Sequence, residues 1–221
     1  MAEPEMMAFL RALQKNNSLA WMAENKPWQR RAAAQFEGLV QNLLLALSQD
    51  DPALAGLPAK GLIARLNRDT RFGADKSPYH CAFRAHLSTA GRQPVPVGYY
   101  LYLSPGRSFL GGGLFAALPG APDRVRQAIL ERPADVEAAL AQPIEVRGEK
   151  LKNVPAGYAK DHPLAESLKH KSWYIEDPVP DEALQDLDAF CADAARRFLQ
   201  MRPLNDFLNR ALSGYRLPDR K

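Results

Sequence analysis

The chain has 221 residues and a mass of 24.5 kDa, which is enough for one good-sized domain with a hydrophobic core. Hydrophobic residues make up 46% and charged residues 24% of the chain, a composition that excludes a disordered protein, a coiled coil or a small disulfide scaffold. The formal net charge of +4 is too small to indicate binding to nucleic acid or to a membrane.

Three features predict a cytoplasmic protein that has no metal centre, no cofactor and no membrane association. Cys81 and Cys191 lie far apart, without the spacing of zinc ligands or of a redox pair, and we expect both thiols to be free. The first five residues are acidic where a signal peptide would be basic. The longest strongly apolar run, residues 43–47, is too short to cross a bilayer.

The N-terminal quarter has the pattern of helices. Phe9, Leu10 and Leu13 form a short apolar stripe, and Asn17 or Ser18 is a suitable N-cap for a second helix. Pro27 predicts a kink or a new helix start near Lys26. The clearest helix follows, because six apolar residues keep helical spacing: Phe36, Leu39, Val40, Leu43, Leu44 and Leu47.

The middle of the chain changes to the alternation of half-buried strands. Residues 83–88 and 97–104 alternate apolar and polar side chains, and residues 108–113 return after Pro105-Gly106, a pair that suits a type II turn. We therefore expect residues 97–103 to pair with residues 108–114 in an antiparallel hairpin.

Helical patterns return in the C-terminal half, with short strands between them. We expect helices at 122–132, 133–140, 181–201 and 203–212, and short strands at 144–147 and 172–175. Helices thus bracket a central antiparallel sheet, which is an α+β fold. Because no repeat or linker composition interrupts the chain, we expect residues 1–221 to form a single domain.

The segment from Lys60 to His86 concentrates positive charge, with six basic residues against two acids. Arginine forks spaced as they are here suit carboxylate or phosphate oxygens, so the segment predicts an anion-binding loop. The candidate ligand-binding residues are Arg65, Arg68, Arg71, Lys76, Tyr79, Tyr100, Lys169 and Lys171. The candidate acid–base residues are Asp69, Asp75 and His162.

Three functions remain open from the residues alone. The first is a site for a phosphate- or carboxylate-bearing small molecule, enzymatic or not. The second is nucleic-acid binding, with phosphates on the basic segment and bases on a tyrosine among residues 99–102. The third is a structural or interaction domain whose Arg/Asp loop is an internal ion-pair lattice. The sequence identifies no reaction, because it lacks a serine-hydrolase elbow, a Walker loop and a dinucleotide fingerprint.

The chain also resembles a known family over nearly its whole length. The resemblance rests first on the string Arg68-Asp69-x-Arg71-Phe72-x-x-Asp75-Lys76-Ser77-Pro78-Tyr79. Further matching stretches are Gly98-Tyr99-Tyr100-Leu101, Gly111-Gly112-Gly113-Leu114, Asp161-His162-Pro163 and Lys169-His170-Lys171-Ser172. These motifs are similar to those of the family catalogued as domain of unknown function 2461. The resemblance implies a single intracellular domain and brings no assigned activity or catalytic residues.

Overall fold

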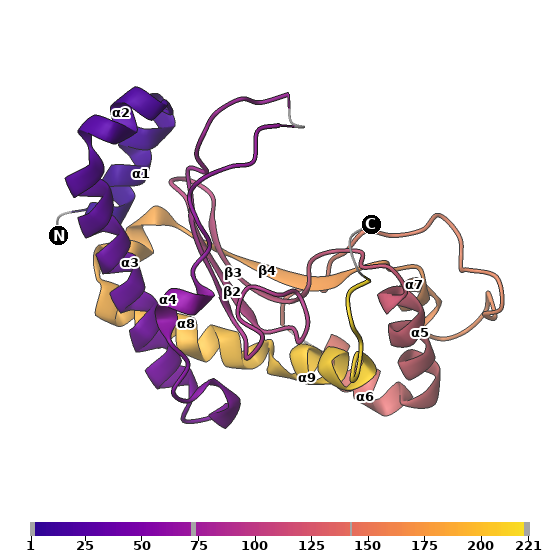
Figure 1. Cartoon of the computed structure of the whole chain (residues 1–221). Coiled ribbons are helices and arrows are strands. Elements are labelled where there is room, and N and C mark those ends of the chain that lie inside the picture. The colour runs from indigo at the N-terminus through magenta and orange to yellow at the C-terminus, as the bar shows by residue number, and fades with distance from the viewer. Residues whose placement is uncertain (1–2, 72–73, 142, 219–221) are drawn as a thin grey trace. The chain divides into compact units, whose positions relative to one another are not determined.

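The computed structural model describes residues 3–71, 74–141 and 143–218 (Figure 1). These residues divide into two compact units, each built from separate parts of the chain. Unit 1 comprises Met1–Arg92, Tyr100–Leu110 and Pro178–Leu199, and unit 2 comprises Gln93–Tyr99, Gly111–Asp177 and Gln200–Lys221. The expectation of a single domain stays a prediction.

Unit 1 begins with three helices, α1 (Glu5–Lys15), α2 (Leu19–Glu24) and α3 (Lys26–Leu47). The Ser18 hydroxyl accepts a hydrogen bond from the Trp21 amide and so caps α2, as the sequence predicts. Pro27 lies in the first turn of α3, where its missing N–H costs nothing, which confirms a new helix start at Lys26. All six members of the expected stripe on α3 are buried. The short helices η1 (Pro52–Leu54) and α4 (Ala59–Leu62) follow.

A four-stranded antiparallel sheet occupies the middle of the described chain, in the order β1-β2-β3-β4. Its strands are β1 (Phe83–Leu87), β2 (Tyr99–Leu103), β3 (Ser108–Leu114) and β4 (Trp173–Val179). The predicted hairpin is confirmed as β2 and β3, joined by a turn in which the Arg107 amide donates to the Ser104 carbonyl. Gly106 has a φ of +74° in this turn, a conformation that favours glycine.

The two faces of the sheet differ in burial within unit 1. Phe83 is buried on one face, where its ring stacks on Phe36 of α3 and lies 6.3 Å from the ring of Phe9 on α1. The burial of alternate residues in β1 and β2 shows that the intervening side chains belong to the opposite, half-exposed face. The helices α1 and α3 therefore form the core of unit 1 with the face that carries Phe83.

Unit 2 contains α5 (Ala121–Glu131), α6 (Pro133–Leu140), α7 (Ala165–Leu168) and α9 (Arg202–Ala211). Its most buried charge is the guanidinium of Arg126, which donates to the carbonyls of Leu168 and His170 and pairs with Asp123 at 2.8 Å. These bonds attach α5 to the end of α7 and to the segment that follows it. A buried arginine is tolerated because its donors are hydrogen-bonded.

Two expected elements need correction. Residues 181–201 do not form one helix: η2 (Asp181–Gln185) ends before α8 (Leu187–Gln200). The cause is Asp186, whose backbone is extended and whose Oδ1 accepts from the amides of Asp188 and Ala189, so it caps a new helix. Residues 144–147 do not form a strand either, and only Arg147 pairs with Tyr174 in an isolated bridge.

Over the residues described here, no helix is long and apolar enough to cross a membrane. Within the same residues, no group of three His, Cys, Asp or Glu side chains is placed to hold a metal ion. Cys81 and Cys191 are free thiols, as expected.

Candidate anion-binding site

The basic segment folds as a hairpin at the edge of the sheet in unit 1. Residues 63–68 run antiparallel to residues 78–85, with bridges from Ile63 to Ala85 and from Asn67 to Tyr79. Backbone hydrogen bonds of 2.7–2.9 Å hold the two runs together, for example from the His80 amide to the Leu66 carbonyl. The connecting loop, residues 69–77, includes two residues outside the described part of the chain. The two paired runs and the described loop residues between them, residues 63–71 and 74–85, are called the basic hairpin.

The loop residues of the basic hairpin are linked to one another. Arg68 pairs with Asp75, and Arg71 donates to both carboxylate oxygens of Asp69 at 2.9 and 2.6 Å. The ammonium of Lys76 donates to the Thr70 carbonyl at 2.9 Å. Of the three expectations, the ion-pair lattice fits these contacts best. The prediction that Arg68, Arg71 and Lys76 hold an anion stays a prediction.

These ion pairs also bear on Asp69 and Asp75 as acid–base candidates. Hydrogen bonds from Arg68 and then from Ser77 hold the pKa of the Asp75 carboxyl well below its ordinary value. The side chain and backbone of Arg71 lower the pKa of Asp69 in the same way. A carboxylate with a lowered pKa is a weak base near neutral pH, so this environment does not favour either residue for proton abstraction.

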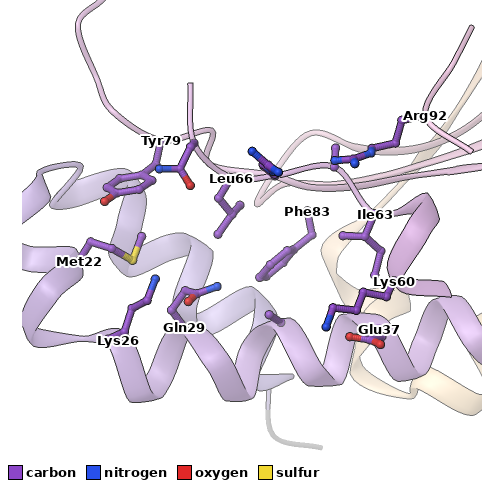
Figure 2. A pocket seen from close by; sticks show the side chains of 14 residues that line it. Met22, Lys26, Gln29, Glu37, Lys60, Ile63, Leu66, Tyr79, Phe83 and Arg92 are labelled. Atoms are coloured by element: carbon purple, nitrogen blue, oxygen red, sulfur yellow. The ribbon is translucent and has the colours of Figure 1, made fainter. Parts of the chain in front are cut away.

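A cleft of about 390 Å³ lies between α3 and the basic hairpin (Figure 2). The α3 wall is formed by Lys26, Gln29, Ala33 and Glu37, whose spacing of three or four residues places them along one side of the helix. Figure 2 shows Lys26 and Gln29 toward one end of this wall and Glu37 toward the other.

The opposite wall comes from α4, the basic hairpin and the loop after β1. Lys60 belongs to α4, and Arg65, Asn67 and Tyr79 belong to the hairpin. Arg92 lies beyond β1. Ile63 and Ala64 and the buried side chains of Met22, Leu66 and Phe83 complete the lining.

Asn17 fixes the position of Tyr79 in this wall. Its side-chain amide donates to the Tyr79 carbonyl at 2.9 Å, and its carbonyl oxygen accepts from the Tyr79 amide at 3.1 Å. The same amide lies 3.3 Å from the Cys81 sulfur. The segment between α1 and α2 thereby holds the second run of the basic hairpin against the N-terminal helices.

The cleft carries an excess of positive charge. Four cations, Lys26, Lys60, Arg65 and Arg92, face one acid among the described lining residues, Glu37, a difference of 4 − 1 = +3. All four cations are exposed at the rim. Within residues 3–71, 74–141 and 143–218, no hydrogen bond or ion pair engages any of these four side chains. The side chains of Arg68, Arg71 and Lys76, in contrast, each have a partner within the loop.

The other predicted residues lie outside the cleft. Tyr100 is on the half-exposed face of the sheet, where burial raises the pKa of its hydroxyl. His162, Lys169 and Lys171 belong to unit 2. There His162 Nδ1 accepts from the Leu164 amide, Lys169 pairs with Glu166 at 2.5 Å, and Lys171 pairs with Glu149.

The cleft therefore brings together Arg65 and Tyr79 from the predicted set and adds residues that the sequence did not single out. Lys26, Gln29 and Glu37 could have been found from their helical spacing beside the buried stripe of α3. Arg92 carries no such signal, because only the fold brings it to the rim.

A family model described as a conserved hypothetical protein (DUF2461) matches residues 5–207. The chain belongs to this family. The match runs from α1 into α9, so it includes the cleft and most of both units. Comparisons with curated proteins and with solved structures give no match.

Proposed function

We propose that the protein binds a small molecule bearing a carboxylate or phosphate group in the cleft between α3 and the basic hairpin. The observation that carries this proposal is the set of four cations around one cleft with no counter-charge bound to them in the described chain. A cleft of about 390 Å³ is within the ordinary size range of small-molecule sites.

The chemistry of the lining supports an organic anion. The guanidinium of Arg65 offers paired donors to a carboxylate or phosphate, and Lys26 and Lys60 add mobile point charges. The amides of Gln29 and Asn67 supply neutral polar groups for orientation. Met22, Leu66 and Phe83 offer an apolar base for the body of the ligand.

The cleft is favoured over the loop of the basic hairpin for an energetic reason. An anion at Arg68 or Arg71 would compete with a carboxylate already in contact. An anion in the cleft displaces only water from exposed cations and relieves their mutual repulsion. If the bound molecule is transformed, Glu37 is the carboxylate at hand among the described lining residues. Catalysis and a cytoplasmic location stay predictions.

Thermal melting with a panel of anions tests the proposal. The panel contains inorganic phosphate, citrate, phosphorylated sugars and short dicarboxylates, with chloride at matched ionic strength as control. A ligand at about 100 times its Kd stabilises the native state by about 2.7 kcal/mol. For a chain of this size that raises Tm by about 5–11 °C.

Two matched arginine variants locate the site. We expect Arg65→Gln to abolish the ligand-induced shift, because Arg65 lines the cleft. We expect Arg71→Gln to retain it, because that side chain is 77% exposed and paired with Asp69 in the loop. The opposite pattern would place the anion in the loop. An unchanged Tm with every anion in the panel would refute the proposed function.

A further inference from the structure

Aromatic rings form a row on the half-exposed face of the sheet in unit 1, opposite the face that carries Phe83. The row consists of His86 on β1, Tyr100 and Tyr102 on β2, and Phe109 on β3. The rings of Tyr102 and Phe109 stack with centroids 4.9 Å apart and planes 13° apart. The Tyr100 ring lies 6.1 Å from Phe109 and 6.5 Å from His86. These four residues, with Arg84, are called the ring face.

The composition of the ring face is unusual for the outward side of a sheet. Alternation normally places charged and small polar residues there, but β2 reads Tyr-Tyr-Leu-Tyr-Leu and has aromatic residues at its outward positions. The sequences of β1, β2 and β3 contain no Asp or Glu at all. Their one charged residue is Arg84. The four rings are half-buried, so each keeps part of its surface accessible to a ligand.

Positive charge lies beside these rings. Arg84 is half-buried on the ring face and donates through one terminal nitrogen to the Arg65 carbonyl at 3.1 Å. Its Nε is buried without a hydrogen-bond partner among the described residues. Burial, and then the charges of Arg84 and Arg68, lower the pKa of His80 at this edge of the sheet.

We propose that the ring face binds single-stranded nucleic acid, with bases stacked on the aromatic rings and the phosphate backbone near Arg84. Stacking on aromatic side chains tolerates any base, and a cation beside the rings attracts the backbone. The absence of carboxylates from β1, β2 and β3 fits a polyanionic partner. A duplex is disfavoured because its bases already stack on one another. This inference is independent of the anion site in the cleft.

Fluorescence anisotropy tests the inference with a fluorescein-labelled oligouridylate and oligothymidylate of about 12 nucleotides, within the range of site sizes for such surfaces. We expect both to bind, and a labelled duplex of the same length to bind more weakly. Affinity should fall as salt rises from about 50 to 200 mM, with a log–log slope of about −0.7 for each phosphate contacted.

Two variants of Tyr102 separate ring stacking from general charge. Tyr102→Leu removes the ring and should weaken binding about five-fold or more, the lower limit for losing one stacked base. Tyr102→Phe keeps the ring and should keep the wild-type affinity. Phe109→Leu serves as a second ring deletion if Tyr102→Leu melts far below the wild type.

Several results would overturn the inference. These are no binding to either oligonucleotide, equal binding to the duplex, or wild-type affinity in both ring deletions. If Arg65→Gln lowers the affinity for the oligonucleotide as much as Tyr102→Leu does, the nucleic acid binds at the cleft instead. Self-association of the wild type that Tyr102→Leu abolishes, measured by light scattering, would show that a second copy of the chain covers the ring face.

Discussion

Asn17 links the N-terminal helices to the wall of the cleft, and replacing it with alanine tests that link. Asn17→Ala removes both hydrogen bonds to the backbone of Tyr79. Each such bond contributes a net 0.5–1.5 kcal/mol or so, which gives a loss of about 2 kcal/mol for the pair. The freed backbone groups belong to a half-buried residue that water can reach, so we add no further penalty. For a chain of this length, the expected fall in Tm is about 4–8 °C.

The neighbouring residue provides the matched control for this change. Asn16 is exposed, and its side chain makes one hydrogen bond, to the Ala12 carbonyl at the end of α1. Asn16→Ala should therefore lower Tm by about half as much or less. Calorimetry of the three proteins in the same buffer measures both shifts. A Tm for Asn17→Ala equal to that of the wild type, or equal shifts in the two variants, would refute the assigned role of Asn17.

Two further predictions concern unit 2. Gly113→Ala should destabilise the protein far more than Gly106→Ala in chemical denaturation. Both glycines have positive φ, but an added Cβ at Gly113 would lie 2.3 Å from the Trp173 carbonyl oxygen, whereas open space surrounds Gly106. Similar losses of stability in the two variants would show that this close approach is wrong. Burial lowers the pKa of His170, so the unfolded chain binds more protons below about pH 6.5. The contribution of His170 to the free energy of unfolding should thus be complete above that pH and decrease on acidification. The decrease from this residue is at most about 1.4 kcal/mol per pH unit. An NMR titration that finds the His170 pKa at or above 6.5 would contradict the burial argument.

The parts of the fold that depend on local pattern could be predicted from the sequence. Proline in a first turn and a regular apolar stripe define α3, and the Pro105-Gly106 turn with alternating neighbours defines the β2–β3 hairpin. The break before α8 was missed because Asp186 lies within a continuous helical stripe, and only its extended backbone makes it a cap.

The candidate site was predictable only in part, because local sequence pattern does not show which residues the fold brings together. Charge density along the chain singles out the basic hairpin, and Arg65 and Tyr79 do line the cleft. Charge density does not show which cations have partners, and Asp69 and Asp75 engage Arg71 and Arg68 within the loop. The cleft also needs a helix from the start of the chain, which no local pattern pairs with residues 60–92.

The anion site is the central claim, and a crystal soaked in selenate tests it most directly. Selenate resembles phosphate in shape and charge. The anomalous scattering of selenium distinguishes a bound selenate from water and from other anions. The account predicts a peak in the cleft, beside Arg65 and between α3 and the basic hairpin. A peak beside Arg68 and Arg71 with none in the cleft, or an empty cleft in fully soaked crystals, would contradict it.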